Sequence, residues 1–569
     1  MASPKSRLLE LLLTICLVYL FIPTTSSRAL ERDDVTYTYD VVIYGNTVAA
    51  LAAAVQTKRM KKSVAIVIPG NTLGGLTTSG LGWTDNKNGN SIGGIAREFY
   101  SKIFAYYQNT SKWTSETRSA YIARKIRAQP GPAIEESKKV QWTFEPKVAE
   151  YIWEKWMKDG KIPIFRNEAI DRSRSGVVKD GASITSFSTQ SGSIFKAKMF
   201  IDASYEGDLM ETAGVPYRTG REGRDEFDEP LAGVLINSPN RLSNIDPYVK
   251  KGNSNSGLIA GIQRVIGDAQ SVMGKPDLYR LQSYNYRLTL TKVDNNKTPF
   301  LKPAGYDEST YEILFRYIES GYTGPFFTSQ LMPNIKTDSN AAGQVSTDLI
   351  GGNYDDESKS NYVEFSYQQR EAILSAHKVY TQGFLWTLAN HPRIPLSIRT
   401  AISKWGYAKD EFVSNGNWPY EIYIREGRRM VGVYTMKQDD VQEPKQFPSD
   451  AVVGMGSYYL DVHQVERVVV DDRIYDEGYV HVVTNAPFAI PFNAIIPRAS
   501  SATNFLNPVA MSSTHIAYSA IRMEPTYMIL GQSAATAAVM AIEQGVKIQD
   551  VDRVKLTARL MADKQVLSL

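Results

Sequence analysis

The chain has 569 residues, more than one simple hydrophobic core accommodates, and this length predicts two intertwined lobes. Its 64 basic and 60 acidic residues give a net charge of +4, and its basic clusters are short, which argues against a nucleic-acid-binding protein. A composition that is 43% hydrophobic, without low-complexity tracts, excludes a disordered or fibrous protein.

The N-terminal segment predicts a secretory signal peptide over residues 1–27. Lys5 and Arg7 precede an apolar stretch at residues 8–22, and small polar residues follow it. The stretch is short for a membrane span, so a retained signal anchor is the alternative, and no later segment is apolar enough to cross a bilayer. The single cysteine, Cys16, lies inside the signal, so the mature chain is expected to contain no disulfide and no thiolate metal site.

Two glycosylation sequons, which begin at Asn109 and Asn296, agree with passage through the secretory pathway. We therefore expect a glycoprotein that is secreted or held in the lumen of that pathway. After cleavage of the signal it should have no stable membrane span.

The first folded unit is predicted to be strand, turn, helix and strand. Residues 40–44 and 63–68 are apolar β-branched runs typical of strands buried on both faces, and the alanine-rich residues 51–60 between them predict a helix. The turn at residues 45–50 would present backbone N–H groups and the positive end of the helix dipole to a phosphate. A glycine-rich loop at residues 70–85 follows. This order predicts a dinucleotide-binding unit, with an ordinary βαβ unit as the alternative.

The next segments continue an α/β pattern. Amphipathic helices are predicted over residues 92–107 and 144–157, and a short strand over 162–165. Residues 176–196 alternate as in a β-meander, and residues 198–203 predict a parallel strand that ends at a polar turn.

Residues 216–486 interrupt this pattern and predict an inserted substrate domain. The strongest helical patterns within it cover residues 366–388 and 420–436, so we expect a mixed, mainly helical domain. The α/β pattern returns in residues 487–569, with a small-residue helix from about residue 524 to 544.

The whole chain therefore predicts a three-layer, Rossmann-like α/β domain with a parallel sheet and a β-meander. Its two parts are residues 38–215 and residues 487–569, which also include a C-terminal tail.

Nine blocks of sequence resemble one known family when they are taken together. They include LGGLTTSGLGWTD, IGGIAREFY and IDASYEGDLM, and the full set is residues 73–85, 92–100, 201–210, 334–338, 348–354, 425–432, 513–518, 521–525 and 530–538. In combination they resemble the FAD-dependent oxidoreductase family, whose members carry a glutathione-reductase-type flavin fold with a large insertion. Some members have been labelled xanthan-lyase-like.

The resemblance implies a non-covalently bound FAD and oxidation of a small organic substrate by hydride transfer to the flavin. Outside the cytosol, O2 is the simplest electron acceptor, and a role in secondary metabolite biosynthesis fits the resemblance more loosely. The alternatives are a polysaccharide-active lyase and a non-catalytic protein with a degenerate flavin pocket.

The implied cofactor-binding residues come from the turn, the glycine-rich loop, the end of the strand at 198–203 and the last helix, where the residues from Gly531 are expected to present a helix N-terminus to the flavin. They are Gly45, Asn46, Thr47 and Ala50; Gly74, Gly75, Thr78, Ser79 and Gly82; Asp202 and Glu206; and Gly531, Gln532 and Ser533. The alternative for Asp202 and Glu206 is capping of a turn, and for the last three residues close helix packing.

The sequence departs from the family pattern at two places that bear on FAD. The turn is usually glycine at the positions of Asn46 and Ala50, and a side chain at Asn46 stands near the phosphates. Ile68 occupies the position where a glutamate normally binds the adenosine ribose. Loss of that charge-assisted hydrogen bond costs on the order of 1.5–3 kcal/mol.

Proton transfer requires a base, and histidine suits this role. We expect His515, which precedes the last helix, to form the catalytic group with Arg522 and Glu524, and His463 is the second candidate. The alternative is a polar cluster that only satisfies a buried loop. Three arginines at positions 425, 428 and 429 are expected on a helix, paired with nearby carboxylates or clamping an acidic substrate. No metal-site spacing is present.

Overall fold

The computed structural model describes residues 35–484 and 487–569. The signal peptide expected over residues 1–27, with Cys16 inside it, lies outside the described residues. Residues 36–569 form one structural unit. Within the described part of the chain, no helix combines the length and the apolar character that a membrane crossing needs.

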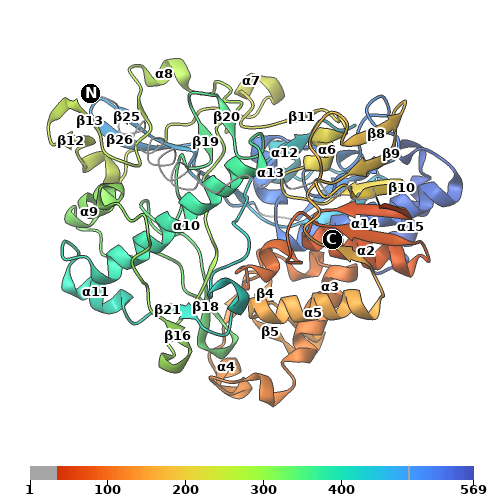
Figure 1. Cartoon of the computed structure of the whole chain (residues 1–569), viewed down its shortest axis with the longest axis horizontal. Helices are drawn as coiled ribbons and strands as arrows, with labels where there is room; N and C mark the ends of the chain where they lie inside the picture. The colour runs from red at the N-terminus through yellow and green to blue at the C-terminus, as the bar shows by residue number, and fades with distance from the viewer. Residues whose placement is uncertain (1–34, 485–486) are drawn as a thin grey trace, which may run out of the picture. The chain divides into compact units, whose positions relative to one another are not determined.

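The unit contains a seven-stranded sheet in the order β7-β2-β1-β10-β9-β8, with β29 paired to β10 (Figure 1). Its strands are β1 (Thr36–Tyr44), β2 (Val64–Val67), β7 (Ile164–Phe165), β8 (Val177–Asp180), β9 (Ser183–Ser188), β10 (Ile194–Asp202) and β29 (Phe505–Leu506). The β7, β2, β1, β10 and β29 strands are parallel, and β8 and β9 complete an antiparallel meander. The predicted parallel sheet with a β-meander is confirmed.

Helices from the two ends of the unit pack side by side on this sheet. α2 (Val48–Arg59) follows β1, and α14 (Glu524–Gln544) lies along α2 and contacts β1 and β10 (Figure 1). A Cβ atom at Gly531 would lie 2.2 Å from the carbonyl oxygen of Ala49, so the missing side chain allows the two helices to approach closely. The opening and closing segments of the chain therefore form one domain.

Three further helices surround this pair. α3 (Gly94–Tyr106) and α15 (Arg553–Ala562) contact α14, and α5 (Pro146–Asp159) contacts α2 and α3. These bounds confirm the helices predicted near residues 92–107 and 144–157.

The inserted segment is not mainly helical, which corrects the expectation from its sequence. Its helices include α9 (Glu312–Glu319), α10 (Tyr367–Asn390) and α11 (Leu396–Ile402). The insertion also contains many short strands. Five of them form one sheet: β15 (Leu288–Thr291), β16 (Lys297–Thr298), β17 (Gln330–Met332), β18 (Lys336–Ser339) and β21 (Gly406–Ala408). Another sheet joins β14 (Arg264–Val265), β25 (Glu466–Val470) and β26 (Arg473–Glu477).

The helix predicted over residues 420–436 is absent, and the only regular element there is the short strand β22 (Arg429–Met430). Tertiary ion pairs override the local pattern, because its three arginines bind carboxylates on separate segments. Arg425 pairs with Asp348 at 2.9 Å, Arg428 with Asp208 at 2.9 Å and Arg429 with Glu222 at 2.8 Å.

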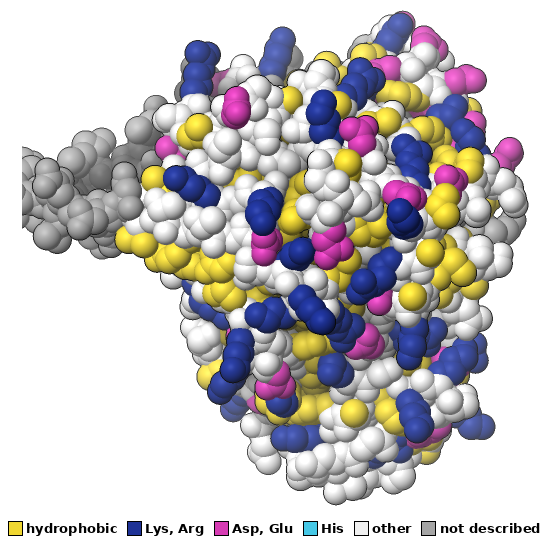
Figure 2. All heavy atoms as spheres, turned by 90° about the vertical axis from the view of Figure 1, so that its right-hand side faces the viewer, with side chains coloured by type: hydrophobic (Ala, Val, Ile, Leu, Met, Phe, Trp, Pro, Cys, Tyr) yellow, Lys and Arg dark blue, Asp and Glu magenta, His cyan; other side chains and the backbone are white. Residues whose placement is uncertain are grey.

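Charged side chains are distributed over the face shown in Figure 2, which is the side where β8, β9 and α15 lie in Figure 1. Lys and Arg side chains are spread across it, and Asp and Glu side chains lie between them. Such an intermixed surface is ordinary for a folded protein with a small net charge.

Candidate active site and cofactor-binding turn

The turn after β1 leaves the start of α2 without a side-chain cap. Gly45 has a φ of +116°, and a Cβ atom there would lie 2.4 Å from the backbone of Ala203. The Thr47 hydroxyl donates to the Ala203 carbonyl at 2.7 Å and makes no capping hydrogen bond. The first turn of α2, through Ala50, is fully buried. Its backbone N–H groups and the helix dipole therefore suit a bound anion.

The side chain of Asn46 binds a carboxyl group from the insertion. Its Nδ2 donates to Glu421 Oε1 at 2.8 Å, and the Thr72 hydroxyl donates to the same oxygen at 3.3 Å. Burial and the nearby Glu206 raise the pKa of Glu421 to about 7. From the sequence, Glu421 was a candidate partner for the nearby arginines; no local pattern indicates its contact with Asn46, which is 375 residues away.

The glycine-rich loop is shaped by contacts within the protein. Gly74 and Gly75 have φ values of +93° and +52°, and Cβ atoms there would lie 2.4 Å from Thr78 and from the Tyr205 hydroxyl, respectively. Ser79 is fully buried, and its hydroxyl has no hydrogen-bond partner among the described residues. That free hydroxyl leaves a polar group for a ligand.

Gly82 contacts other parts of the chain. A Cβ atom there would lie 2.1 Å from Met332 Sδ and 2.2 Å from the Phe144 carbonyl oxygen. Close packing against the insertion therefore explains this glycine, and its predicted contact with the cofactor stays a prediction.

Asp202 and Glu206, at the end of β10, have different environments. Asp202 is fully buried and accepts hydrogen bonds from the backbone and hydroxyl of Ser204 and from the Met210 backbone. It therefore caps the turn into α6 (Asp208–Thr212), which was the structural alternative. Glu206 is partly exposed, and burial together with the nearby Asp208 raises its pKa against the opposing effect of Arg370.

α14 begins at Glu524 and ends at Gln544, which confirms the helix predicted over about 524–544; the expectation that Gly531, Gln532 and Ser533 open this helix is wrong, because they lie inside it. Gln532 Oε1 accepts a hydrogen bond from the Ile95 backbone at 2.8 Å, and Ser533 Oγ donates to the Val453 carbonyl at 2.6 Å. These side chains tie the middle of α14 to neighbouring segments. The small residues that suggested a helix start are explained by packing against α2.

Glu524, the first residue of α14, joins three segments of the α/β domain. It accepts hydrogen bonds from the Tyr205 and Thr77 hydroxyls, both at 2.7 Å. Burial raises its pKa to about 7. The N-terminus of α14 therefore lies beside both the glycine-rich loop and the turn after β10.

The structure does not bring His515, Arg522 and Glu524 into one contacting group. His515 is 2% exposed, and its Nδ1 lies 2.7 Å from Glu426 Oε1. Its backbone donates to Glu222 at 2.9 Å. His515 is thus enclosed in an ion-pair network. This is the environment expected of a polar cluster that only satisfies a buried loop, which was the alternative to a catalytic base.

Arg522 belongs to a buried group around Tyr423. Its Nη1 donates to the Tyr423 hydroxyl at 2.6 Å, and its guanidinium is 5.2 Å from the ring centroid. Arg425 and Arg287 approach the same ring at 4.9 and 5.9 Å. Within the described chain, Nε of Arg425 and of Arg522 has no hydrogen-bond partner. Three arginines therefore surround one aromatic ring, and two retain an unused donor.

His463, the second predicted base, completes this group, which we name the arginine–histidine cluster: Arg287, Asp348, Tyr423, Arg425, Asp461, His463 and Arg522. His463 Nδ1 lies 2.8 Å from Asp348 Oδ2, and Asp348 Oδ1 lies 2.9 Å from Arg425. The Arg522 Nη2 group donates a hydrogen bond to the Asp461 backbone carbonyl at 2.7 Å. Burial raises the pKa of Asp348, but Arg425 and His463 outweigh it and hold that pKa at about 2.

The sequence reasoning missed several residues of this cluster. Asp348 begins one of the nine blocks but had no assigned role, and Tyr423 lay in the segment predicted as a helix. Asp85, at the end of the glycine-rich loop, lies 3.8 Å from Arg287, and burial raises its pKa to about 6. Only tertiary structure brings these segments together.

One carboxylate triad resembles a metal site in its spacing. Oxygen atoms of Glu145, Asp410 and Glu411 lie within 4.8 Å of one another. The Lys336 ammonium binds all three, at 2.6, 2.8 and 2.6 Å, and is fully buried. The lysine supplies the positive charge that a metal ion would bring.

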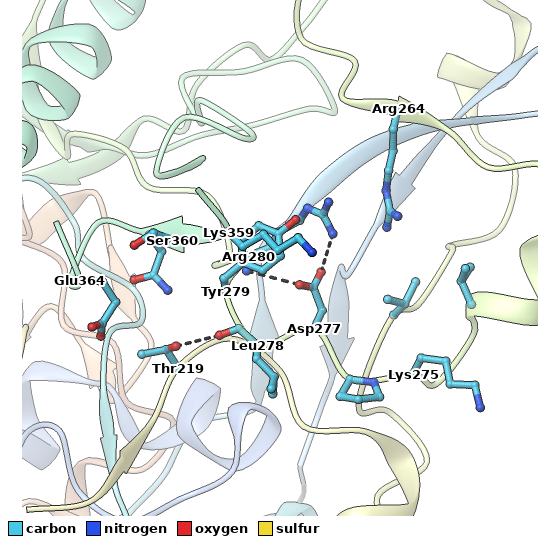
Figure 3. Close-up of a pocket in the computed structure, with 14 residues that line it drawn as sticks. Thr219, Arg264, Lys275, Asp277, Leu278, Tyr279, Arg280, Lys359, Ser360 and Glu364 are labelled. Carbon is cyan, nitrogen blue, oxygen red and sulfur yellow. Dashed lines mark hydrogen bonds and ion pairs between the residues drawn. The ribbon is translucent and has the colours of Figure 1, made fainter. Parts of the chain in front are cut away.

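A separate cavity of about 560 Å³ lies on the insertion (Figure 3). Its arginines are paired: Arg280 with Asp277 at 3.2 Å, and Arg264 with Glu466 at 2.9 Å. None of the predicted site residues lines it. The cavity is therefore distinct from the arginine–histidine cluster.

The sequence matches the model of a family described as FAD dependent oxidoreductase over residues 40–560. The chain belongs to this family. The match includes both parts of the nucleotide-binding domain and the insertion between them. A search of curated proteins found no match.

Solved flavoenzyme structures show only a distant likeness to this FAD-dependent oxidoreductase. An L-amino acid deaminase from Proteus vulgaris is 14% identical, covers 34% of this chain and 62% of its own, and has a TM-score of 0.22. A flavin-containing monooxygenase from Stenotrophomonas maltophilia is 15% identical over 33% and 43%, with a TM-score of 0.19. OxyS anhydrotetracycline hydroxylase from Streptomyces rimosus is 11% identical over 36% and 41%, with a TM-score of 0.22. This chain thus spans less than two thirds of each.

The residues present fit the FAD that family membership implies. The uncapped start of α2, the left-handed glycines at positions 45, 74 and 75, and the unpaired Ser79 hydroxyl suit a dinucleotide. Asn46 and Ile68 are the departures, and Ile68 is fully buried in the apolar core.

Proposed function

We propose that this FAD-dependent oxidoreductase is an oxidase of the secretory pathway that oxidises a small organic substrate beside the arginine–histidine cluster. The observation that carries the proposal is the environment of His463. Its Nδ1 is held by Asp348, whereas its side chain keeps 15% exposure and Nε2 is 3.7 Å from the nearest carboxylate oxygen, on Asp461. A histidine oriented in this way is equipped to accept a proton.

The chemistry removes a hydride and a proton from the substrate. FAD supplies the acceptor for the hydride and its two electrons. The ionised Asp348 accepts the Nδ1–H of His463, which leaves the Nε2 lone pair available for the proton of a substrate O–H or N–H group. The substrate C–O or C–N single bond becomes a double bond.

Arg522 and Arg425 would bind and orient the polar end of the substrate. Each is buried, and each has an Nε donor without a partner among the described residues. Tyr423 fixes the Arg522 guanidinium through its hydroxyl. Because these guanidinium donors are already held in place, they can stabilise the charge that develops on the substrate as the proton moves. The protein does not have to reorganise first.

The predicted signal peptide supports the location, and O2 is then the simplest electron acceptor outside the cytosol. Asn109 is exposed, as glycosylation requires, whereas the Asn296 amide donates to Asp410 at 2.8 Å. A role in secondary metabolite biosynthesis is an extension of the proposal that rests on the sequence resemblance alone.

The test is anaerobic flavin reduction by a panel of small alcohols, amines and hydroxy acids, followed by exposure to O2. The proposal predicts that a substrate bleaches the flavin and that O2 restores its colour with formation of H2O2. Electron transfer to an added dye without O2 consumption would contradict the oxidase assignment. Unsaturated sugar products without flavin reduction would instead indicate the lyase.

A further inference from the structure

The position that normally binds the adenosine ribose cannot do so in this chain. Ile68 directly follows β2, is fully buried and belongs to the apolar core. Its backbone continues the pairing with the β7 segment through a hydrogen bond from its N–H to the Phe165 carbonyl at 2.9 Å. A dinucleotide site of this type uses an acidic side chain at this edge of the sheet to accept the ribose hydroxyl.

A carboxyl group nevertheless lies at this edge, and it comes from the insertion. Glu421 Oε1 accepts hydrogen bonds from Asn46 and Thr72, which follow β1 and β2 respectively. The Gly45 N–H donates to the Val67 carbonyl at 2.9 Å, so the ends of the two strands are adjacent. Glu421 is therefore next to the phosphate-binding turn and the loop after β2.

We propose that Glu421 supplies the carboxylate that binds the adenosine ribose of FAD, in place of the residue at position 68. The two departures from the family pattern, Asn46 and Ile68, are then connected. The Asn46 amide holds the Glu421 carboxylate, which replaces the one missing at position 68. Thr72 directs the same oxygen, and Oε2 has no hydrogen-bond partner among the residues that the structure describes. Oε2 is the atom available to a ribose hydroxyl.

The electrostatics of the site support a hydroxyl-bearing partner. Burial, Glu206 and Glu371 disfavour the ionised form of Glu421, and the hydrogen bonds from Asn46 and Thr72 only partly offset them. A ribose hydroxyl would donate one more hydrogen bond to the carboxylate. Glu421 is also held in place on its own side, because the Tyr423 N–H donates to the Asn285 carbonyl at 2.8 Å.

This inference rests on FAD binding in the proposed function, and a paired comparison of ligands tests it. The full chain is stripped of flavin, and the dissociation constants of FAD and of its 2′-deoxyadenosine analogue are measured by flavin fluorescence. Wild type should bind FAD roughly ten- to a hundredfold more tightly than the analogue. Glu421→Ala should lose this preference and bind both ligands with similar affinity.

Two further variants make the result specific. Glu371→Gln is the matched control, because Glu371 raises the pKa of Glu421 through space but is not a hydrogen-bond partner of Asn46 or Thr72. The Glu371→Gln protein should keep the preference for FAD. Glu421→Gln retains the size of the side chain and should reduce the preference even if the alanine variant does not fold.

The possible outcomes distinguish a failure of this inference from a failure of the proposed function. A Glu421→Ala or Glu421→Gln protein that prefers FAD as strongly as wild type would overturn the inference and leave the oxidoreductase proposal intact. Equal binding of both ligands by wild type would do the same. Failure of wild type to bind FAD at all would overturn both.

Discussion

Two histidines with similar polar neighbours differ in what they offer a substrate. His515 and His463 each place Nδ1 against a carboxylate, at 2.7 and 2.8 Å. His515 is enclosed at 2% exposure, whereas the His463 side chain is 15% exposed beside two arginines with unused donors. Burial therefore separates a structural role from a catalytic one at the scale of single residues.

Replacement of His463 should abolish turnover without loss of the cofactor. His463→Asn keeps an amide donor for Asp348 but removes the proton acceptor, so flavin reduction should slow by about 10²- to 10⁴-fold. The measurement is the anaerobic rate of flavin reduction, with FAD content determined in parallel. His515→Asn should mainly lower thermal stability; if it slows reduction as much while His463→Asn does not, the assignment is wrong.

Glu524 should make stability depend on pH. Its folded-state pKa of about 7 lies above the ordinary value of 4.5, so the unfolded chain loses this proton first as the pH rises. The stabilisation from the neutral carboxyl is complete below about pH 4.5 and is lost as the pH rises through 7.

Glu524→Gln removes this dependence. Urea unfolding of both proteins at pH 5 and pH 8 should show wild type losing at most about 3 kcal/mol relative to the variant. An equal difference at the two pH values would show that the carboxyl is ionised in the folded protein.

At the scale of elements, the sequence predicted those whose local pattern agrees with their packing. The buried strand β1, the amphipathic helices α3 and α5 and the small-residue helix α14 were all predicted. The helix predicted over residues 420–436 is wrong, because the spacing of its arginines reflects separate ion pairs and not one helix face. Glu421 and Tyr423 could not be assigned for the same reason, since long-range contacts position them.

The packing of α14 on α2 predicts an unusual effect of alanine. In a helix interior Ala is normally about 1 kcal/mol more favourable than Gly. Gly531→Ala should instead destabilise the protein by about 1–3 kcal/mol, because its Cβ would lie 2.2 Å from the Ala49 carbonyl. Thermal unfolding measures this, with Gly267→Ala as the control because nothing lies within 4 Å of its Cβ position. A stabilised Gly531→Ala protein would contradict the close approach of the helices.

The buried ammonium of Lys336 joins β18 of the insertion to the start of α5. Lys336→Met leaves Glu145 and Glu411 buried without their cation, and should lower the free energy of unfolding by about 3–5 kcal/mol. Lys147→Met is the control, because Lys147 is 32% exposed and the change should cost about 1 kcal/mol or less. Equal stability of the two variants in urea would show that Lys336 is not essential to this contact.

At the scale of the whole molecule, the first and last segments form the cofactor-binding domain and the insertion completes the site. The βαβ unit and the sequence blocks predicted the family, the fold class and the cofactor. They singled out His463, Arg522 and Arg425 separately but did not predict the arginine–histidine cluster that joins them, whose residues come from the insertion and from the segment before α14. These residues carry the substrate proposal, and no local pattern connects them.

The central claim is that the turn after β1 and the α2–α14 pair hold FAD. The most direct test is the flavin content of the purified mature chain, determined from its absorbance spectrum and from the cofactor released on denaturation. The structure predicts one FAD per chain. A colourless protein that takes up no FAD when the cofactor is added would contradict the account.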